Sequence, residues 1–200
     1  MVLFVALGLL ALLVPLLYRE ARIWWVLNVN PPNWGPSVPV ERVASPYFHR
    51  RPVRVDIIVI HTTEGSLASA IAWFQYNPGE VSSHYLIGKD GQIVQMVDER
   101  YAAHHAGEVT APLGTRWYGD NPNDYSIGIE LENDSVLRDP ADLPAAQRDA
   151  LWLLAKDIVS RHHLPVDPQH IVAHSVIDPL NRQDPGPGFP WEEFLSYLKK

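Results

Sequence analysis

The chain has 200 residues, of which 46% are hydrophobic and 20% are charged, and it contains seven tryptophans. This composition excludes a disordered chain, which would be poor in aromatic residues, and the length suits one ordinary domain with a short extension. The formal net charge of −7 argues against nucleic acid as a partner, because proteins that bind nucleic acid usually present a basic face. No cysteine is present, so any metal ion must be bound by histidine and carboxylate side chains.

Residues 2–17 form an uncharged apolar run that is followed by Arg19, Glu20 and Arg22. A helix over this run would be about 24 Å long, somewhat short of the roughly 30 Å core of a bilayer. We expect residues 1–22 to form a hydrophobic helix that acts as an uncleaved membrane anchor, because the run has neither a basic segment before it nor an Ala-x-Ala site after it. A cleaved signal peptide and a buried core helix are the alternatives.

Residues 23–45 are rich in proline, and we expect them to be an extended linker that leaves residues 46–200 as the folded domain. An anchor would tether this domain to the cell envelope, and we expect the domain on the extracytoplasmic side of the membrane. The arginines after the apolar run favour the cytoplasmic side under the positive-inside rule, so that side is the alternative location.

The domain begins with a continuous apolar run over residues 53–60, which is typical of a strand buried on both faces and ends at His61. Ser66 is expected to cap a short amphipathic helix that ends before Pro78. Residues 83–97 contain two strand-like segments around a Lys-Asp-Gly turn and predict a hairpin.

Residues 125–131 alternate in polarity, which places Glu130 on the face opposite the apolar side chains. The longest helix is expected over residues 143–163 and a last helix over residues 191–198, each with an apolar stripe. Strands and helices therefore interleave, and the sequence predicts a single α/β domain with a mixed central β-sheet flanked by helices.

Two histidines and one aspartate are the candidates for metal binding. His61 follows a buried strand, and open α/β sheets bind ligands at the carboxyl ends of their strands, although for His61 alone a structural role in the core is the alternative. His174 and Asp184 lie in a segment stiffened by prolines. Two imidazoles and one carboxylate match a catalytic zinc site that leaves a position open for water. The remaining histidines in surface or helix-end positions receive no catalytic role: His49, His162, His163 and His170.

Six short strings occur together and in this order: IVIHTTEG at 58–65, SHYLI at 83–87, HAG at 105–107, NDYSIGIE at 123–130, AHS at 173–175 and DPGP at 184–187. In this combination the chain, from about Arg54 to Leu198, resembles the zinc-dependent N-acetylmuramoyl-L-alanine amidases of the second type. Their superfamily also contains peptidoglycan recognition proteins and phage-type lysozymes.

The resemblance implies a mixed sheet with helices on its faces and Zn²⁺ bound by His61, His174 and Asp184. It also implies hydrolysis of the amide bond between N-acetylmuramic acid and L-alanine in peptidoglycan or muropeptides. Glu130 takes the position of the general base, which would accept a proton from water and deliver it to the departing nitrogen. The alternative function is a recognition module that binds peptidoglycan without hydrolysing it. The intact ligand and glutamate positions favour the enzyme.

The resemblance also implies roles for residues around this centre. Some positions there differ from the family pattern. Arg182 stands where close relatives carry a lysine that steadies the oxyanion, so we expect it to act in catalysis. His105 and His84 are expected to bind substrate, with a structural place in the sheet as the alternative for His84. Ser83 stands where the phage-type branch has tyrosine, and His104 stands where the family commonly has tryptophan.

Overall fold

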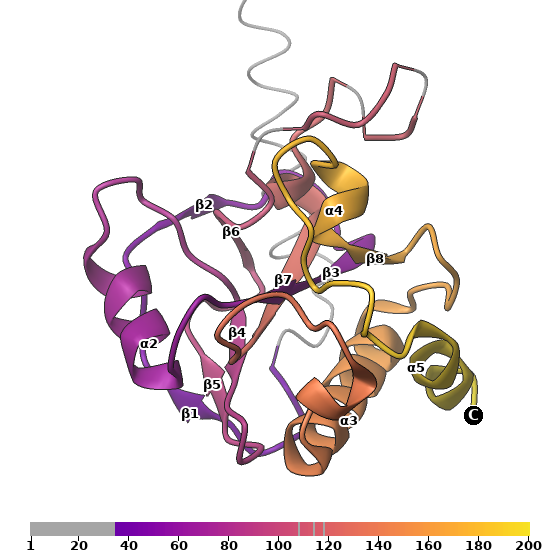
Figure 1. The fold of residues 1–200 in the computed structure, drawn as a ribbon. Helices are drawn as coiled ribbons and strands as arrows, with labels where there is room; N and C mark the ends of the chain where they lie inside the picture. The colour runs from indigo at the N-terminus through magenta and orange to yellow at the C-terminus, as the bar shows by residue number, and fades with distance from the viewer. Residues whose placement is uncertain (1–34, 108, 114, 118) are drawn as a thin grey trace, which may run out of the picture.

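The computed structural model describes residues 35–107, 109–113, 115–117 and 119–200 (Figure 1). The predicted hydrophobic helix over residues 1–22 lies outside them, and within the described ranges no helix is long and apolar enough to cross a membrane. The elements follow in chain order as β1 (Glu41–Arg42), β2 (Phe48–Arg50), β3 (Ile57–Thr62), α2 (Leu67–Tyr76), β4 (Tyr85–Ile87), β5 (Ile93–Gln95), β6 (Tyr101–Ala103), η1 (Pro122–Tyr125), β7 (Ser126–Leu131), η2 (Pro140–Asp142), α3 (Ala145–His162), β8 (Ile171–Ala173), α4 (His174–Ile177) and α5 (Trp191–Leu198).

Six strands form one mixed sheet in the order β1-β5-β4-β7-β3-β8. Strands β4, β7, β3 and β8 run parallel to one another, whereas β5 runs antiparallel to β4 and β1 runs parallel to β5. Strands β2 and β6 form a separate antiparallel pair. The predicted mixed central sheet is therefore confirmed, and the predicted hairpin is β4–β5.

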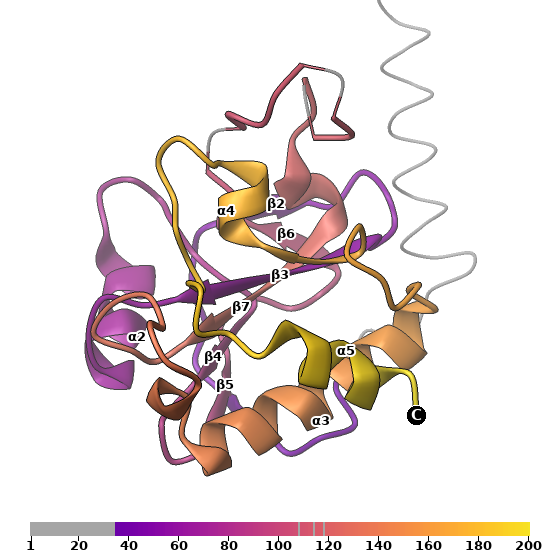
Figure 2. The ribbon, with the colours of Figure 1, turned by 45° about the vertical axis from the view of Figure 1, so that its right-hand side comes forward.

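Helices cover both faces of the sheet (Figures 1 and 2). Helices α3 and α5 pack on one face, where the apolar side chains of β7 join the largest core. On the opposite face α2 packs over β4 and β5, and α4 packs over β3 and β8. The alternation predicted for residues 125–131 is confirmed, because it directs Ser126, Gly128 and Glu130 to the face that carries α2 and α4.

The predicted helix signals agree with the structure. The Ser66 side chain accepts a hydrogen bond from the backbone N–H of Ser69 at the start of α2, and Asn77 follows its last residue. Helix α3 begins after Pro144 and ends at His162, and it is followed by His163, whose φ of 56° is left-handed. The last helix has the predicted bounds.

The sheet begins inside the segment predicted as a linker. Strand β1 pairs with Val94 and Gln95 of β5, while Val38 and Val40 pack against the main core. The folded unit therefore starts before the predicted boundary at residue 46. Prolines in this segment are compatible with β1 because it is a short strand at the edge of the sheet.

A fully buried arginine ties the β2–β6 pair to the main sheet. Arg51 Nε donates to the Glu99 carbonyl oxygen at 2.9 Å, and Arg51 Nη2 donates to the Ser126 carbonyl oxygen at 2.9 Å. The Glu99 carboxylate lies 2.6 Å from both Arg161 Nη1 and His162 Nε2. Burial lowers the pKa of Arg51 to about 10. Burial opposes the ionisation of Glu99, but hydrogen bonds to Arg161 and His162 lower its pKa to about 2. His162 is thus a partner in a buried ionic network.

Candidate metal centre

Three neighbouring parallel strands end at the candidate site. His61 of β3 pairs in register with Glu130 of β7. On the other side of β3, Ile60 pairs with Ala173, so His174 follows at the end of β8. Side chains at paired positions of adjacent strands project to the same face. The parallel ladder therefore brings His61, Glu130 and His174 together at the carboxyl ends of the strands, as the sequence predicts for His61.

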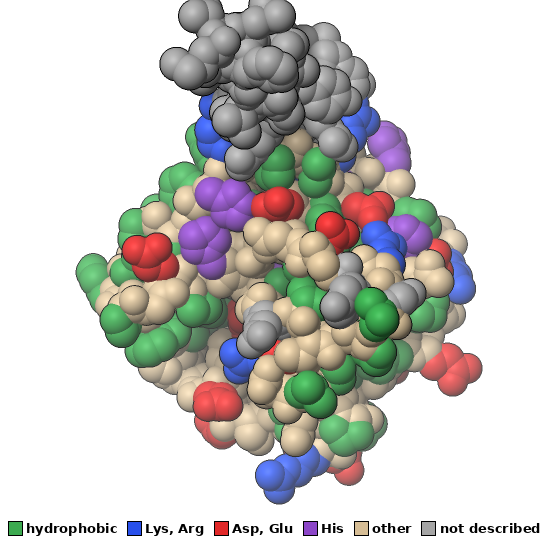
Figure 3. Space-filling view, turned by 90° about the horizontal axis from the view of Figure 1, so that it is seen from above, with side chains coloured by type: hydrophobic (Ala, Val, Ile, Leu, Met, Phe, Trp, Pro, Cys, Tyr) green, Lys and Arg blue, Asp and Glu red, His purple; other side chains and the backbone are tan. Residues whose placement is uncertain are grey.

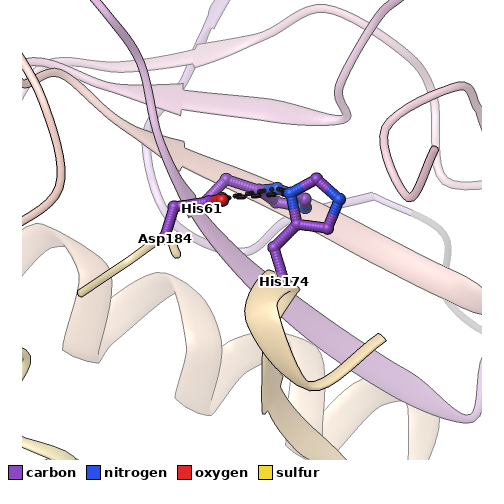
Figure 4. Close-up of side chains that lie close together, drawn as sticks. All are labelled: His61, His174 and Asp184. Carbon is purple, nitrogen blue, oxygen red and sulfur yellow. Dashed lines mark hydrogen bonds and ion pairs between the residues drawn. The ribbon is translucent and has the colours of Figure 1, made fainter. Parts of the chain in front are cut away.

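The three predicted metal ligands converge (Figure 4). His61 Nδ1 lies 3.0 Å from His174 Nδ1 and 3.2 Å from Asp184 Oδ2, and His174 Nδ1 lies 3.1 Å from the same oxygen. Two ligand atoms of a tetrahedral Zn²⁺ ion with bonds of about 2.0–2.1 Å lie about 3.3 Å apart. All three side chains are buried. The spacing and the donor set fit one ion of the size of zinc.

Hydrogen bonds on the far side of each ring prepare the histidines for a cation. His174 Nε2 lies 3.1 Å from the Ala106 carbonyl oxygen, which only accepts, so this nitrogen carries the hydrogen. His61 Nε2 lies 3.0 Å from His105 Nδ1, and His105 Nε2 lies 2.9 Å from Ser126 Oγ. With hydrogens on the Nε2 atoms of His61 and His105, the Nδ1 lone pairs of both candidate ligands are free for a metal ion. Such outer partners orient metal ligands and raise their basicity.

Backbone contacts hold the loop that carries Asp184. The Ser175 N–H donates to the Asp184 carbonyl oxygen at 3.1 Å, which links the two ligand segments. The Leu137 N–H donates to the Pro185 carbonyl oxygen at 2.7 Å. Gly186 has a φ of +102°, and a Cβ at this position would clash with the Leu137 carbonyl group, so glycine is required there. Asp184 is therefore placed by a loop that is fastened at both sides.

The ionisation of His61 and Asp184 suits metal binding. Burial and the neighbouring charge of His174 lower the pKa of His61 to about 4, so this ring is neutral at pH 7. Burial opposes the ionisation of Asp184, but hydrogen bonding to the His174 and His61 rings holds its pKa well below the ordinary value. Neutral imidazole and carboxylate are the forms that bind metal ions.

Glu130 lies beside the ligand triangle. Its Oε1 is 4.0 Å from His61 Nδ1, and its side chain is 11% exposed. Burial and the charge of Asp184 raise the pKa of Glu130 to about 8 in the metal-free protein. A cation nearby favours the charged form of a carboxyl group, so a metal ion in the triangle would shift Glu130 toward the carboxylate.

Arg182 lies at the exposed edge of the site. Its side chain is 52% exposed, and its Nε is 4.0 Å from Asp178 Oδ2. The positive charge of Arg182 partly offsets the rise in the pKa of Glu130. The same charge adds to the fall in the pKa of His61. Its contact with an oxyanion stays a prediction.

His105 and His84 lie beneath the ligands, where the structure leaves little surface for a substrate. His105 is 5% exposed and contacts His61, and a Cβ on Gly128 would lie 2.5 Å from its ring. His84 is fully buried, and its Nδ1 accepts the Gly128 N–H at 3.1 Å. Within the chain, the ring nitrogens of both residues already meet other groups, and their predicted contact with a substrate stays a prediction. His105 contacts the candidate ligand His61, and His84 contacts the backbone of the strand that carries Glu130.

Two polar residues that the sequence analysis does not single out hold this arrangement. Asn123 Oδ1 accepts the backbone N–H groups of His105 and Ala106 at 3.0 and 2.8 Å, and Ser126 meets the His105 ring. For Ser126, the available signal is its position on the same strand face as Glu130. For Asn123, no sequence pattern indicates which backbone groups it binds.

A buried triangle of two histidines and an aspartate, with a glutamate alongside on a mixed sheet, defines a centre suited to hydrolysis at a single metal ion. The family model described as N-acetylmuramoyl-L-alanine amidase matches residues 50–187, and the chain belongs to this family.

Curated relatives agree with this membership. N-acetylmuramoyl-L-alanine amidase AmiD of Escherichia coli is 40% identical over 156 residues, which are 72% of this chain and 53% of that protein. The chain thus spans about half the length of this relative. N-acetylmuramoyl-L-alanine amidase A of Achromobacter lyticus is 35% identical over 159 residues, which are 70% of this chain and 81% of that protein.

Solved structures share the fold. A crystal structure of an AmpD derivative matches with a TM-score of 0.67 at 29% identity and covers 84% of this chain and 99% of that chain. Escherichia coli AmiD in complex with the substrate anhydro-N-acetylmuramic acid-L-Ala-D-gamma-Glu-L-Lys matches with a TM-score of 0.60 at 36% identity and covers 74% of this chain and 58% of that chain.

Proposed function

We propose that this protein is a zinc-dependent amidase that hydrolyses the bond between the lactyl group of N-acetylmuramic acid and L-alanine. One observation carries the proposal: the Nδ1 atoms of His61 and His174 and the Oδ2 atom of Asp184 lie within 3.0–3.2 Å of one another, beside the buried Glu130. Family membership supplies the bond that is cleaved.

The chemistry divides between the metal ion and the chain. When bound by His61, His174 and Asp184, zinc supplies a Lewis acid that polarises a carbonyl group and acidifies water. Glu130 then accepts a proton from the attacking water and returns it to the departing L-alanine nitrogen. The position of Glu130 suits both steps, because it lies next to the ligands without being one and is shielded from bulk solvent.

Arg182 is the proposed partner of the developing oxyanion. Its guanidinium keeps the positive charge of the lysine that the resemblance implies at this position but spreads it over a planar group. We expect Arg182→Gln to lower kcat more than it changes KM, and Arg182→Lys to retain most of the turnover, because both Arg and Lys place a cation at this edge. Equal kcat values for the Gln variant and the unchanged protein would contradict this role.

The proposed substrates are peptidoglycan and muropeptides, including fragments with an anhydro end. The structure of the relative AmiD contains an anhydro-muropeptide. Relatives from Salmonella typhimurium and Citrobacter freundii are named 1,6-anhydro-N-acetylmuramyl-L-alanine amidases. Comparing hydrolysis rates on intact sacculi, on soluble muropeptides and on their anhydro forms ranks these classes.

Activity is tested with the full chain and purified peptidoglycan. Newly exposed L-alanine amino termini are expected, and a chelator should abolish them until Zn²⁺ is restored. Glu130→Ala is expected to lose turnover and keep zinc, whereas Glu132→Gln, which changes a carboxylate on the same strand face, is expected to keep both. Binding of peptidoglycan by the zinc-loaded protein without release of amino termini would contradict the proposal and favour a recognition module.

The proposed location is the cell envelope, with residues 1–22 as a membrane anchor and the domain on the extracytoplasmic side. Tethering an enzyme raises its effective concentration against a fixed polymer such as the wall. A reporter that is active only outside the cytoplasm, fused after Lys200, is expected to be active. Activity of a reporter restricted to the cytoplasm would contradict this orientation and make soluble fragments the natural substrates.

A further inference from the structure

A second pair of histidines lies on the surface, outside the ligand triangle. His49 belongs to β2 and His104 follows β6, and the antiparallel pairing of these strands brings the two rings together. Their centroids are 5.3 Å apart and their planes are inclined by 28°. Figure 3 shows histidine side chains gathered beside an acidic side chain on the face seen from above. The side chains of His49 and its partner Asp124 are 36% and 29% exposed, so solvent and small ions reach them.

The outer nitrogen of each ring meets a group that accepts hydrogen bonds. His49 Nε2 lies 2.6 Å from Asp124 Oδ1, and His104 Nδ1 lies 2.9 Å from the Glu80 carbonyl oxygen. Since a carboxylate and a carbonyl oxygen do not donate, both outer nitrogens carry the ring hydrogen. A neutral imidazole has only one such hydrogen. When both rings are neutral, the inner nitrogens, His49 Nδ1 and His104 Nε2, therefore both present lone pairs.

These two inner nitrogens lie 3.1 Å apart. Lone pairs that face each other at this distance repel unless a cation lies between them. The separation is close to the 3.0 Å between the Nδ1 atoms of His61 and His174 in the ligand triangle, and to the about 3.3 Å expected for two ligands of a tetrahedral zinc ion. A carboxylate on the outer N–H of His49 is also the partner that raises the basicity of metal-binding histidines.

We propose that His49 and His104 form a second metal site, which takes a divalent transition-metal ion such as Zn²⁺ with water molecules as the other ligands. The site binds its ion more weakly than the ligand triangle, because it offers two protein ligands in place of three and is partly exposed. A proton on one inner nitrogen would also relieve the repulsion. The experiment must therefore distinguish a metal ion from a proton between the two rings.

Equilibrium dialysis of the full chain against increasing free Zn²⁺ tests the proposal. One equivalent is expected to bind at low free zinc and a second at higher free zinc. Asp184→Asn should weaken the first equivalent and leave the second unchanged, so failure of the proposed amidase centre and failure of this site give different results. Titration with Co²⁺, followed by its visible absorption, reports the coordination of each ion independently of activity.

The variants His49→Asn and His104→Asn should each remove the second equivalent and retain the first. His170→Asn is the matched control, because the His170 ring also meets a carboxylate, Asp167 Oδ1, at 2.7 Å but lies outside the pair. This variant should keep both equivalents. A single equivalent at every zinc concentration would overturn the proposal in favour of a proton, and a second equivalent that survives in both pair variants would place it elsewhere and overturn the proposal as well.

Discussion

Gly128 lies against the His105 ring, and Gly128→Ala tests whether this ring positions a metal ligand. A methyl group at residue 128 would lie 2.5–2.7 Å from three atoms of the ring. Ordinary contacts between such atoms are about 3.5–4.0 Å, so the ring must move by about 1 Å. His105 Nδ1 and Nε2 now lie 3.0 and 2.9 Å from His61 and Ser126, and such a shift lengthens both contacts beyond hydrogen-bonding distance.

The expected cost follows from these contacts. Two buried hydrogen bonds contribute about 1 kcal/mol each, and overpacking costs about 1–3 kcal/mol. The free energy of unfolding of the metal-free protein should therefore fall by about 3–5 kcal/mol. Loss of the outer partner of His61 should weaken zinc binding by about 10–100-fold.

Urea unfolding of the metal-free protein and zinc competition with a fluorescent chelator measure the two effects. Gly79→Ala is the matched control, because its Cβ would meet its nearest neighbours at ordinary distances of 3.6 and 3.7 Å. Wild-type stability together with wild-type zinc affinity in Gly128→Ala would refute the positioning role of His105.

Three further predictions concern buried or capping carboxylates. The pKa of Glu99 falls from 4.5 to about 2 on folding. Its contribution of about 3 kcal/mol to the free energy of unfolding is therefore present above pH 4.5 and is lost as the pH falls toward 2. Urea unfolding at pH 6 and pH 3 should show this loss in the wild type and not in Glu99→Gln. Glu132 accepts the backbone N–H groups of Leu67 and Lys89 at 2.9 and 2.7 Å, so Glu132→Ala should lower the free energy of unfolding by about 1–2 kcal/mol, and an unchanged urea midpoint would refute this cap. The pKa of Glu130 in the metal-free protein is raised from 4.5 to about 8. The free energy of unfolding should therefore decline by up to about 5 kcal/mol as the pH rises from 4.5 to 8. Glu130→Gln should remove this decline, and an identical pH dependence in the two proteins would contradict the prediction.

The convergence of the candidate metal ligands could be predicted from the sequence, because local patterns determine their placement. A continuous apolar strand leads directly to His61, and the carboxyl ends of parallel strands meet at one edge of the sheet. The alternation of β7 predicts the face of Glu130. The prolines around Asp184 predict a stiff loop, and the structure adds the backbone contacts that hold it. The resemblance to the amidase family joined these separate signals into one site.

The surroundings of the ligands could not be predicted in the same way, because they depend on contacts between distant segments. The sequence analysis expects His105 and His84 to bind substrate. In the structure, His105 lies against Gly128 and His84 contacts the buried Arg51, so both rings lie under the candidate ligands. Strand β1 lies in a proline-rich segment whose composition indicates a linker. The contact between the His49 and His104 rings follows from the separate β2–β6 sheet. No local pattern in the chain predicts this sheet.

Zinc content and affinity of the full chain at low free Zn²⁺ test the central claim most directly. One tightly bound equivalent is expected in the wild type and in Glu130→Gln, and it should be lost or strongly weakened in His61→Asn, His174→Asn and Asp184→Asn. Retention of tight zinc binding in all three ligand variants would contradict the account, because zinc would then be bound by other residues than the triangle on which the proposed chemistry depends.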